Sequence, residues 1–427
     1  MKKILSLHLK NLAKLIINKY QPVIIGITGS IGKSSAKEAI YAVLKNKLAV
    51  RMSQKNYNNE IGLPLTIIGA ESAGRSLFGW AKIYIQAINL IVFKNKKYPQ
   101  VLVLEMGVDH PGDMSYLTSI VKPMIGLVTA VSYSHFEFFG SVYNIKKEKQ
   151  VLIENLDSRG LAILNYDNEL TREMSDVSRA RILTYGLKEG ADLRAQDVIF
   201  NFTRGNYELS GLNCKLNYKG SVVPVFMNNI MTEGALYAAL AAAAVGIYFE
   251  MNLVDIAQAL QDFSLPHGRM NVLPGINHTF IIDDTYNSSP EACLAALDII
   301  SRFTLDNGSV KYAVLGDMLE LGDYAAEGHQ QVGEKVAASR IDFLLTFGPL
   351  SEIISKAAIS AGLKDNQVFH FLNHSELSDF LKSRIKAGDI VLVKGSQGMR
   401  LEKVVKEIIA EPERAAELLV RQGEQWQ

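Results

Sequence analysis

The residues best suited to chemistry are the glycines, lysine and hydroxyls of residues 26–35. They follow the apolar stretch 23–25 and read Gly-Ile-Thr-Gly-Ser-Ile-Gly-Lys-Ser-Ser. A strand that enters a helix through such a loop surrounds phosphate with backbone N–H groups, and its lysine and first following hydroxyl reach the outer phosphates and Mg²⁺. The strict Walker pattern requires glycine at Ile27, so this loop is a variant. We expect nucleotide phosphate to be bound by Thr28, Gly29, Ser30, Gly32, Lys33, Ser34 and Ser35.

Two further candidates follow apolar stretches that read as parallel strands. Glu105 closes residues 101–104, and His135 follows residues 125–131. Because the carboxyl ends of parallel strands share one edge of a sheet, both side chains are expected beside the phosphate loop. A carboxylate and a neutral imidazole can each bind a metal ion, although either residue can also serve local structure alone. Three lysines follow on a predicted helix, and spacing does not choose among Lys146, Lys147 and Lys149.

Polar residues also follow apolar strands in the second half of the chain. Residues 283–290 read Asp-Asp-Thr-Tyr-Asn-Ser-Ser-Pro, and the amide of Asn287 suits recognition of adenine or ribose. The same letters fit an Asx turn with a helix cap. Residues 316–322 and 394–398 likewise follow apolar stretches. We expect both segments at the carboxyl edge of a second sheet, facing the nucleotide.

The order of the segments predicts an α/β protein with two sheet domains. From residue 22 to 165, strand candidates alternate with helical stretches, which is typical of a largely parallel sheet. Short alternating runs predict a small antiparallel β appendage at about 190–227, and the α/β alternation restarts at about 301. We therefore expect an amphipathic helix over 1–22, a central P-loop ATPase domain over 23–300 that carries the appendage, and a Rossmann-like α/β domain over 301–427.

Composition narrows the class of protein. The 427 residues are 48% hydrophobic, enough for two or three cores. The 45 basic and 44 acidic residues give a net charge of +1, which provides no field for nucleic acid. Only two cysteines occur, Cys214 and Cys293, so no disulfide framework is expected. These features favour a cytoplasmic protein that binds no nucleic acid.

Two apolar helical segments bear on membrane contact. The first has one apolar face, ringed by lysines, that comprises Leu5, Leu9, Leu12 and Ile16. Such a face packs on the protein or lies on a membrane surface, and we favour packing while leaving peripheral membrane contact open. The second, residues 81–93, precedes the lysines of 94–97 and is shorter than the ~20 residues that a membrane span needs. We therefore expect a helix there that does not cross the membrane, and we leave open that it lies near a membrane surface.

Together these motifs resemble the Mur ligases, ATP-dependent enzymes that form amide bonds in peptidoglycan synthesis. The resemblance covers about residues 25–410. The segments that carry it, besides the phosphate loop, are Asn58–Thr66, Glu105–Gly107, His135 with Gly140-Ser141, Asp284–Asn287, Gly316–Gly322 and Val393–Ser396. The asparagine-rich segment and the Gly-Asp-Met-Leu-Glu-Leu-Gly run favour the branch of the family that adds D-alanyl-D-alanine.

The resemblance implies roles for individual residues. The catalytic residues would be Lys33, Glu105, His135 and Lys149, with Lys149 carbamylated and Lys147 the less favoured alternative. The metal ligands would be Ser34, Glu105, His135 and the carbamylated Lys149. Asn287 would contact adenine and Asp317 the ribose. Possible substrate or phosphate contacts are Asn58, Asn59, Arg269 and Lys394.

The resemblance also implies a reaction. ATP, with two Mg²⁺ ions, would phosphorylate the carboxylate of UDP-N-acetylmuramoyl-tripeptide, and the amine of D-alanyl-D-alanine would then displace the phosphate. We expect the enzyme to act as a monomer.

The chain departs from the family in two places, and this leaves alternatives. Only about 22 residues precede the phosphate loop, where family members carry a UDP-binding domain, and Gln397 stands where an arginine is commoner, with Arg400 nearby. One alternative is a related ligase with another acceptor, either folylpolyglutamate-like or modifying lipid-linked peptidoglycan. Another is a regulatory nucleotide-binding protein, against which the retention of Glu105, His135 and Lys149 argues.

Overall fold

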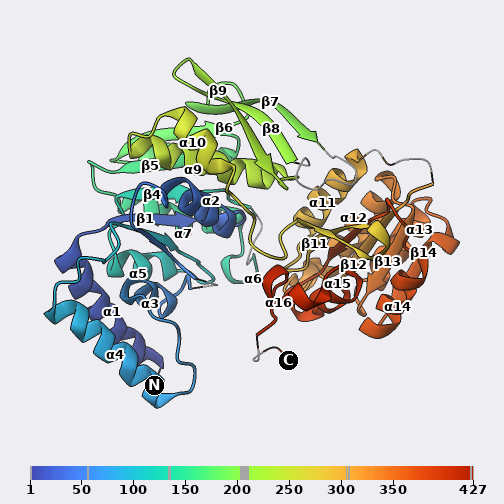
Figure 1. The fold of residues 1–427 in the computed structure, drawn as a ribbon, viewed down its shortest axis with the longest axis horizontal. Coiled ribbons are helices and arrows are strands. Elements are labelled where there is room, and N and C mark those ends of the chain that lie inside the picture. The colour runs from blue at the N-terminus through green and yellow to red at the C-terminus, as the bar shows by residue number, and fades with distance from the viewer. Residues whose placement is uncertain are drawn as a thin grey trace. The chain divides into compact units, whose positions relative to one another are not determined.

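The chain folds into two compact units, which Figure 1 shows as ribbons. The computed structural model describes residues 2–54, 57–132, 136–201, 211–303, 305, 308–423 and 426. The first unit contains Met1–Ile199, Leu212–Asn228 and Glu233–Ser264. The second contains Leu265–Gln427 and two short segments, Phe200–Gly211 and Asn229–Thr232.

A nine-stranded sheet forms the centre of the first unit, in the order β2-β3-β1-β4-β5-β6-β7-β8-β9. All neighbouring pairs from β2 to β7 are parallel. The strands are β1 (Val23–Thr28), β2 (Val50–Met52), β3 (Val101–Glu105), β4 (Ile125–Val128), β5 (Leu161–Asn165), β6 (Arg181–Gly186), β7 (Leu193–Asn201), β8 (Gly211–Tyr218) and β9 (Ser221–Asn228). Because β1 lies between β3 and β4, the loops that follow these three strands meet at one edge.

Helices cover both faces of this sheet. They are α1 (Lys2–Tyr20), α2 (Lys33–Leu44), α3 (Gly62–Ile68), α4 (Leu77–Val92), α5 (Asp113–Ile120), α6 (Phe136–Phe139), α7 (Val142–Glu154), α8 (Glu169–Arg172), α9 (Glu233–Tyr248) and α10 (Leu253–Leu260). Along β3, Leu102 and Leu104 join the core formed with α1, α3, α4 and α5. Helices α2 and α9 pack against each other, with α2 contacting β1 and β3 and α9 contacting β5 and β6.

Helix α1 packs by the apolar face that its sequence predicts. Leu9 and Ile16 are fully buried, and Leu5 and Leu12 are half-buried against the same core. The helix contacts α3 and α4. Among the residues that the structure describes, no helix is both long and apolar enough to cross a membrane.

The predicted appendage is an extension of the first sheet. Strand β7 pairs in parallel with β6, with Tyr185 opposite Leu193, and β8 and β9 follow at that edge. We expected a small antiparallel appendage at about 190–227; β7, β8 and β9 lie in or next to that range, and the parallel pairing of β7 with β6 was not part of the prediction. Alternation along a strand shows which face is buried, but it does not show which neighbour the strand pairs with.

The second unit has a six-stranded sheet in the order β10-β11-β15-β12-β13-β14. Only the pair β10–β11 is antiparallel; the other neighbouring pairs are parallel. Its strands are β10 (Asn271–Pro274), β11 (Phe280–Asp284), β12 (Lys311–Gly316), β13 (Phe343–Phe347), β14 (Val368–Phe371) and β15 (Ile390–Lys394). Its helices are α11 (Pro290–Arg302), α12 (Ala325–Ala338), α13 (Glu352–Ser360), α14 (His374–Arg384), α15 (Glu402–Ile408) and α16 (Ala415–Leu418).

This unit begins earlier than the expected boundary near residue 301. Strand β11 pairs in parallel with β15, with Ile282 opposite Leu392. Helix α11 buries Leu297 and Ile300 in the core of the second sheet. Residues 265–300 therefore belong to the second unit, although we expected them in the central domain. A single apolar strand fits either sheet, so its sequence does not show which one it joins.

Candidate nucleotide and metal site

The phosphate loop joins β1 to α2 through two glycines whose backbone conformations favour glycine. Gly29 has φ +147° and Gly32 has φ +82°. A Cβ atom on Gly29 would overlap Oγ1 of Thr129, because β4 continues directly beside the loop. The N–H of Ser30 donates to the carbonyl of Ala130 at 2.7 Å, which fixes the loop against the next strand. Helix α2 then begins at Lys33, with its N-terminus at the loop.

Lys33 and Ser34 lie at the first turn of α2, as predicted. The Lys33 ammonium donates to the carbonyl of Gly29 at 2.7 Å, so the side chain folds back over the loop. The Ser34 hydroxyl donates to Oε2 of Glu105 at 3.0 Å. Glu105, at the end of β3, is 4% exposed. The structure therefore brings together the loop serine and the strand-end carboxylate, which are 71 residues apart in sequence.

The oxygens at this point fit a magnesium ion. Mg²⁺ prefers hydroxyl, carboxylate, water and phosphate oxygens, and it is commonly held by one or two protein groups together with a bound nucleotide. Ser34 and Glu105 supply such oxygens beside a loop of phosphate-binding type. The other oxygen of Glu105, Oε1, accepts from Nδ2 of Asn58 at 3.4 Å. His135, the further ligand expected from the sequence, lies outside the described residues.

The three lysines of α7 have different environments. Lys149 is 2% exposed, and burial, together with the nearby charge of Lys33, lowers the pKa of its ammonium to about 7; the charges of Asp109 and Glu148 oppose this shift. Lys146 pairs with Glu173. Lys147 is exposed, with its ammonium 4.9 Å from the centre of the Tyr143 ring. The lysine buried beside the phosphate loop is thus Lys149.

The two asparagines of the Asn-Asn-Glu segment differ in function. Asn58 reaches Glu105, as described above, and its carbonyl accepts from the N–H of Gly107 at 2.9 Å. The Asn59 side chain instead accepts from the N–H groups of Ile61 and Gly62, at 3.2 and 2.9 Å, where α3 begins. We expected both to be possible substrate contacts; in the structure the Asn59 side chain bonds the backbone just before α3, and a substrate contact by Asn59 stays a prediction.

In the second unit, Lys394 is held by its own sheet. Its ammonium is 2.6 Å from Oδ2 of Asp284 and donates to the carbonyl of Asn287 at 3.0 Å. The side chain is 2% exposed, which leaves little room for a direct substrate contact. It ties the end of β15 to the turn after β11, and the side chain of Asn287 is exposed at that turn.

Asp317 and Arg269 also have local partners. Asp317 is 1% exposed, and its Oδ1 accepts from the N–H of Ser351 at 2.7 Å, just before α13. The guanidinium of Arg269 lies 4.3 Å from the centre of the Tyr286 ring. Both residues lie near strand ends of the second sheet, and the contacts that they make within the unit are structural.

One ion network in this unit was missed from the sequence. Glu402 is fully buried and accepts from Arg400 at 2.5 Å and from Arg421 at 2.9 Å. Arg421 also donates to the carbonyls of Thr285 at 2.5 Å and Tyr286 at 3.1 Å. Arg400, which we considered as a replacement for the arginine commoner at position 397, thus pairs with Glu402. Lone arginines near a chain end carry no sequence signal of this role.

Asp283 is a buried carboxylate within the same sheet. It is fully buried, its Oδ1 accepts from the N–H and hydroxyl of Thr285, and its Oδ2 has no hydrogen-bond partner among the described residues. Burial raises the pKa of Asp283 to about 6, with the charges of Asp284 and Glu402 adding to the rise and the bonds from Thr285 opposing it.

The raised pKa predicts a pH-dependent stability. Because the folded carboxyl binds its proton more tightly than the unfolded one, its contribution is fully present below pH ~4 and is lost as pH rises through about 6. Thermal unfolding between pH 4 and 8 should show Asp283→Asn gaining a few °C over the parent chain as pH rises through this window. Parallel pH profiles for the two proteins would contradict this account of Asp283.

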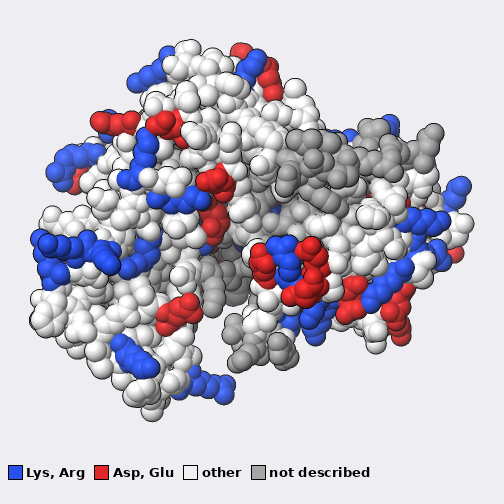
Figure 2. Space-filling model, viewed as in Figure 1, with Lys and Arg blue, Asp and Glu red and all other residues white. Residues whose placement is uncertain are grey.

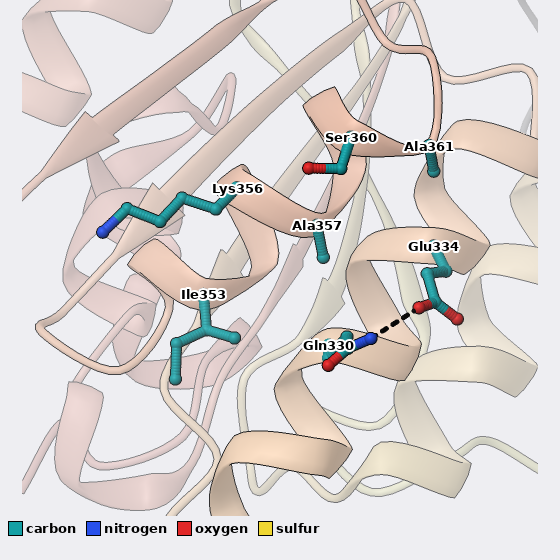
Figure 3. Close-up of a pocket in the computed structure, with 7 residues that line it drawn as sticks. All are labelled: Gln330, Glu334, Ile353, Lys356, Ala357, Ser360 and Ala361. Carbon is teal, nitrogen blue, oxygen red and sulfur yellow. Dashed lines mark hydrogen bonds between the residues drawn. The ribbon is translucent and has the colours of Figure 1, made fainter.

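A separate pocket lies in the second unit between α12 and α13 (Figure 3). It has a volume of about 520 Å³ and is lined by Glu334 and Lys356 among others. Gln330 donates to Glu334 across one turn of α12 at 2.9 Å. None of the residues predicted for the nucleotide site lines it.

The sequence matches two family descriptions over most of its length. The Mur ligase middle domain matches residues 27–78 and 84–246, and the Mur ligase, glutamate ligase domain matches residues 268–397. The chain belongs to the Mur ligase family. This confirms the predicted family and α/β fold class, and as a Mur ligase the chain is an enzyme of the ligase class, as predicted.

Relatives of known name and solved structures match most of this Mur ligase. The UDP-N-acetylmuramoyl-tripeptide–D-alanyl-D-alanine ligase of Bacillus subtilis is 29% identical over 95% of this chain and 79% of its own, and that of Synechocystis is 32% identical over 91% and 75%. The structure of Thermotoga maritima MurF in complex with ADP aligns with a TM-score of 0.75 and 27% identity over 96% of this chain and 84% of that one. The fold also matches MurF of Acinetobacter baumannii, with a TM-score of 0.76 and 23% identity over 94% and 79%.

Proposed function

We propose that this Mur ligase uses ATP to join D-alanyl-D-alanine to UDP-N-acetylmuramoyl-tripeptide, as the names of its relatives in Bacillus subtilis and Synechocystis describe for them. The observation that carries the proposal is the contact between Ser34 and Glu105 beside the phosphate loop. This contact supports the proposal because both side chains offer oxygens that would suit a metal ion beside the loop where ATP phosphates would bind.

Lys33 would hold and neutralise the phosphates. Its ammonium lies over the loop, 2.7 Å from the carbonyl of Gly29, and a bound phosphate would offer it a charged partner in place of that neutral one. The backbone N–H groups around Ser30 and Gly32 and the N-terminus of α2 would add partial positive charge. The ADP in the related Thermotoga maritima structure supports ATP as the nucleotide.

Two magnesium ions would bind here, held by Ser34, Glu105, His135 and Lys149. Bound Mg²⁺ would neutralise phosphate charge during transfer. Lys149 would contribute as a carbamate: its neutral amine takes up carbon dioxide, loses a proton and becomes an anionic oxygen ligand. The pKa of about 7 supports this, because it leaves a large fraction of the amine neutral near neutral pH.

The reaction would have two steps. The γ-phosphoryl group would move from ATP to the substrate carboxylate, giving an acyl phosphate and releasing ADP. The amine of the dipeptide then attacks the acyl carbon; the C–N bond forms, the bond to phosphate breaks and the amine loses a proton. The role of Lys33 is to stabilise the charge that builds on the transferring group.

The second unit would supply nucleoside contacts. Asn287 is exposed at the turn after β11 and suits a contact with adenine. A ribose contact by Asp317 stays a prediction, and it requires the carboxylate to keep or exchange its bond from Ser351. We also propose a monomeric enzyme in the cytoplasm. Because α1 buries its apolar face, a membrane contact by that face is not part of the proposal.

The acceptor is tested by a substrate panel. The purified protein, ATP and Mg²⁺ are incubated with UDP-N-acetylmuramoyl-tripeptide and either D-alanyl-D-alanine or L-glutamate, and with a folate and L-glutamate. We expect mass spectrometry to find the pentapeptide product from the first mixture only. A product in the folate mixture alone would favour the folylpolyglutamate-like alternative instead.

A further inference from the structure

Helix α4 has two apolar faces, only one of which is buried. Ile83, Ala87 and Leu90 are buried in the core of the first unit. The opposite side is also apolar at helical spacing, and its exposed fractions are Phe78 73%, Ile85 59%, Ile88 50% and Val92 62%. A helix on the surface of a soluble protein normally carries polar residues on its outer side, so this second face indicates a partner.

Helix α1 lies beside α4, and the two helices form one continuous part of the surface of the first unit. Lys19 donates to the carbonyls of Leu90 and Ile91 at 3.0 and 2.8 Å, and Tyr20 donates to Leu90 at 3.0 Å. Figure 1 shows the two helices side by side in the first unit, well away from β7–β9. The exposed apolar residues of α1 are Ile4, Leu7 and Leu15.

The charge around this pair of helices is positive. Residues 4–20 and 71–97 contain eight lysines and arginines and one acidic residue, Glu71, whereas the whole chain has 45 basic and 44 acidic residues. The rest of the chain therefore carries an excess of acidic side chains. In Figure 2 the surface over α1 and α4 is mostly uncharged, with blue groups on it.

We propose that the outer face of α4 docks on an anionic lipid membrane, with its apolar side chains in the boundary between headgroups and acyl chains. An apolar stripe bordered by lysines is the pattern of a helix that lies in this boundary. Lys82, whose ammonium is 4.9 Å from the centre of the Phe78 ring, can extend to the headgroups. With 16 residues, α4 is too short to cross a bilayer.

The charge argues against a second copy of the chain as the partner. A symmetric contact through α4 would bring two identical, strongly basic surfaces together, whereas anionic headgroups complement them. The proposal does not depend on the acceptor or amine of the reaction, so it can fail or hold independently of the proposed function.

The test is flotation of the full chain with vesicles, without substrates. We expect binding to vesicles that contain phosphatidylglycerol, weaker binding at high salt, and little binding to phosphatidylcholine alone. Ile85→Glu should weaken binding by about tenfold or more, since it places a charge in the boundary region. Val254→Glu on α10 is the matched control, because Val254 is also exposed (61%) and the charge change is identical.

A second variant keeps the test decisive if Ile85→Glu folds poorly. Replacing Lys94, Lys96 and Lys97, all exposed, by glutamine leaves the apolar face intact and should also weaken binding by about tenfold or more. Absence of binding to phosphatidylglycerol vesicles would overturn the proposal. So would sedimentation showing a dimer that Ile85→Glu converts to monomer, since the face would then bind a second copy.

Discussion

Lys33→Ala is expected to reduce ATP-dependent phosphate release by at least about 10²-fold. The ammonium lies over the phosphate loop at the start of α2, and no other described side chain of α2 is placed to replace it: Lys37 is buried and pairs with Glu38. The charge on the transferring phosphoryl group grows in the transition state. Loss of the Lys33 ammonium should therefore lower kcat more than it raises KM for ATP. The measurement is steady-state phosphate release across ATP concentrations.

Lys45→Ala is the matched control for this variant. Lys45 lies at the other end of the same helix, where its ammonium is 3.6 Å from Asp262 on the protein surface. The change removes the lysine that follows the last residue of α2 but leaves the loop intact, so activity should stay near that of the parent chain. If Lys33→Ala released phosphate at the parent rate, the loop would not be the ATP site.

Lys149→Ala is expected to lose most activity and to regain part of it with added short carboxylates such as acetate. The side chain is buried beside Lys33, and a carbamate there would be an anionic ligand that alanine cannot provide. A small carboxylate can enter the space left by the side chain and supply the missing oxygens. Rescue of this kind is not expected for a lysine with a purely structural role.

Lys147→Ala separates the two neighbouring candidates. Lys147 is exposed over the Tyr143 ring, so its removal should change activity little. The parent and both variants should be compared by thermal unfolding, to show that Lys149→Ala is folded. Full activity in Lys149→Ala, or rescue of Lys147→Ala by acetate, would assign the modified lysine differently.

Features set by contiguous residues could be predicted from the sequence. The phosphate loop follows from the glycines at positions 29 and 32, whose conformations few other residues adopt. The meeting of Ser34 with Glu105 followed from one rule, that parallel strands expose their carboxyl ends at one edge. The packed face of α1 followed from its helical periodicity.

Features set by distant contacts could not be predicted in this way. The choice of Lys149 over Lys147 depends on which side of α7 faces the sheet, and their spacing was compatible with either. That the Asn59 side chain accepts from the N–H groups of Ile61 and Gly62, where α3 begins, could also be seen only in the structure. The start of the second unit at Leu265 depends on β11 pairing with β15, more than 100 residues further along the chain.

The exposed face of α4 shows a further limit of sequence patterns. The sequence predicted a helix at 81–93 that does not cross the membrane, and only the structure separates Ile83, which is buried, from Ile85, which is not. The lysines at 94–97 are evident from the sequence. That they lie beside an exposed apolar face became clear only when the structure showed which residues of α4 are exposed.

The most direct measurement is phosphate release from ATP by the purified full chain, with UDP-N-acetylmuramoyl-tripeptide and D-alanyl-D-alanine supplied together and each omitted in turn. The proposed reaction predicts sustained release only when both are present, with one phosphate for each pentapeptide formed. Release that needs neither substrate, or ATP binding without release in the complete mixture, would contradict the proposal that this chain is the D-alanyl-D-alanine-adding ligase.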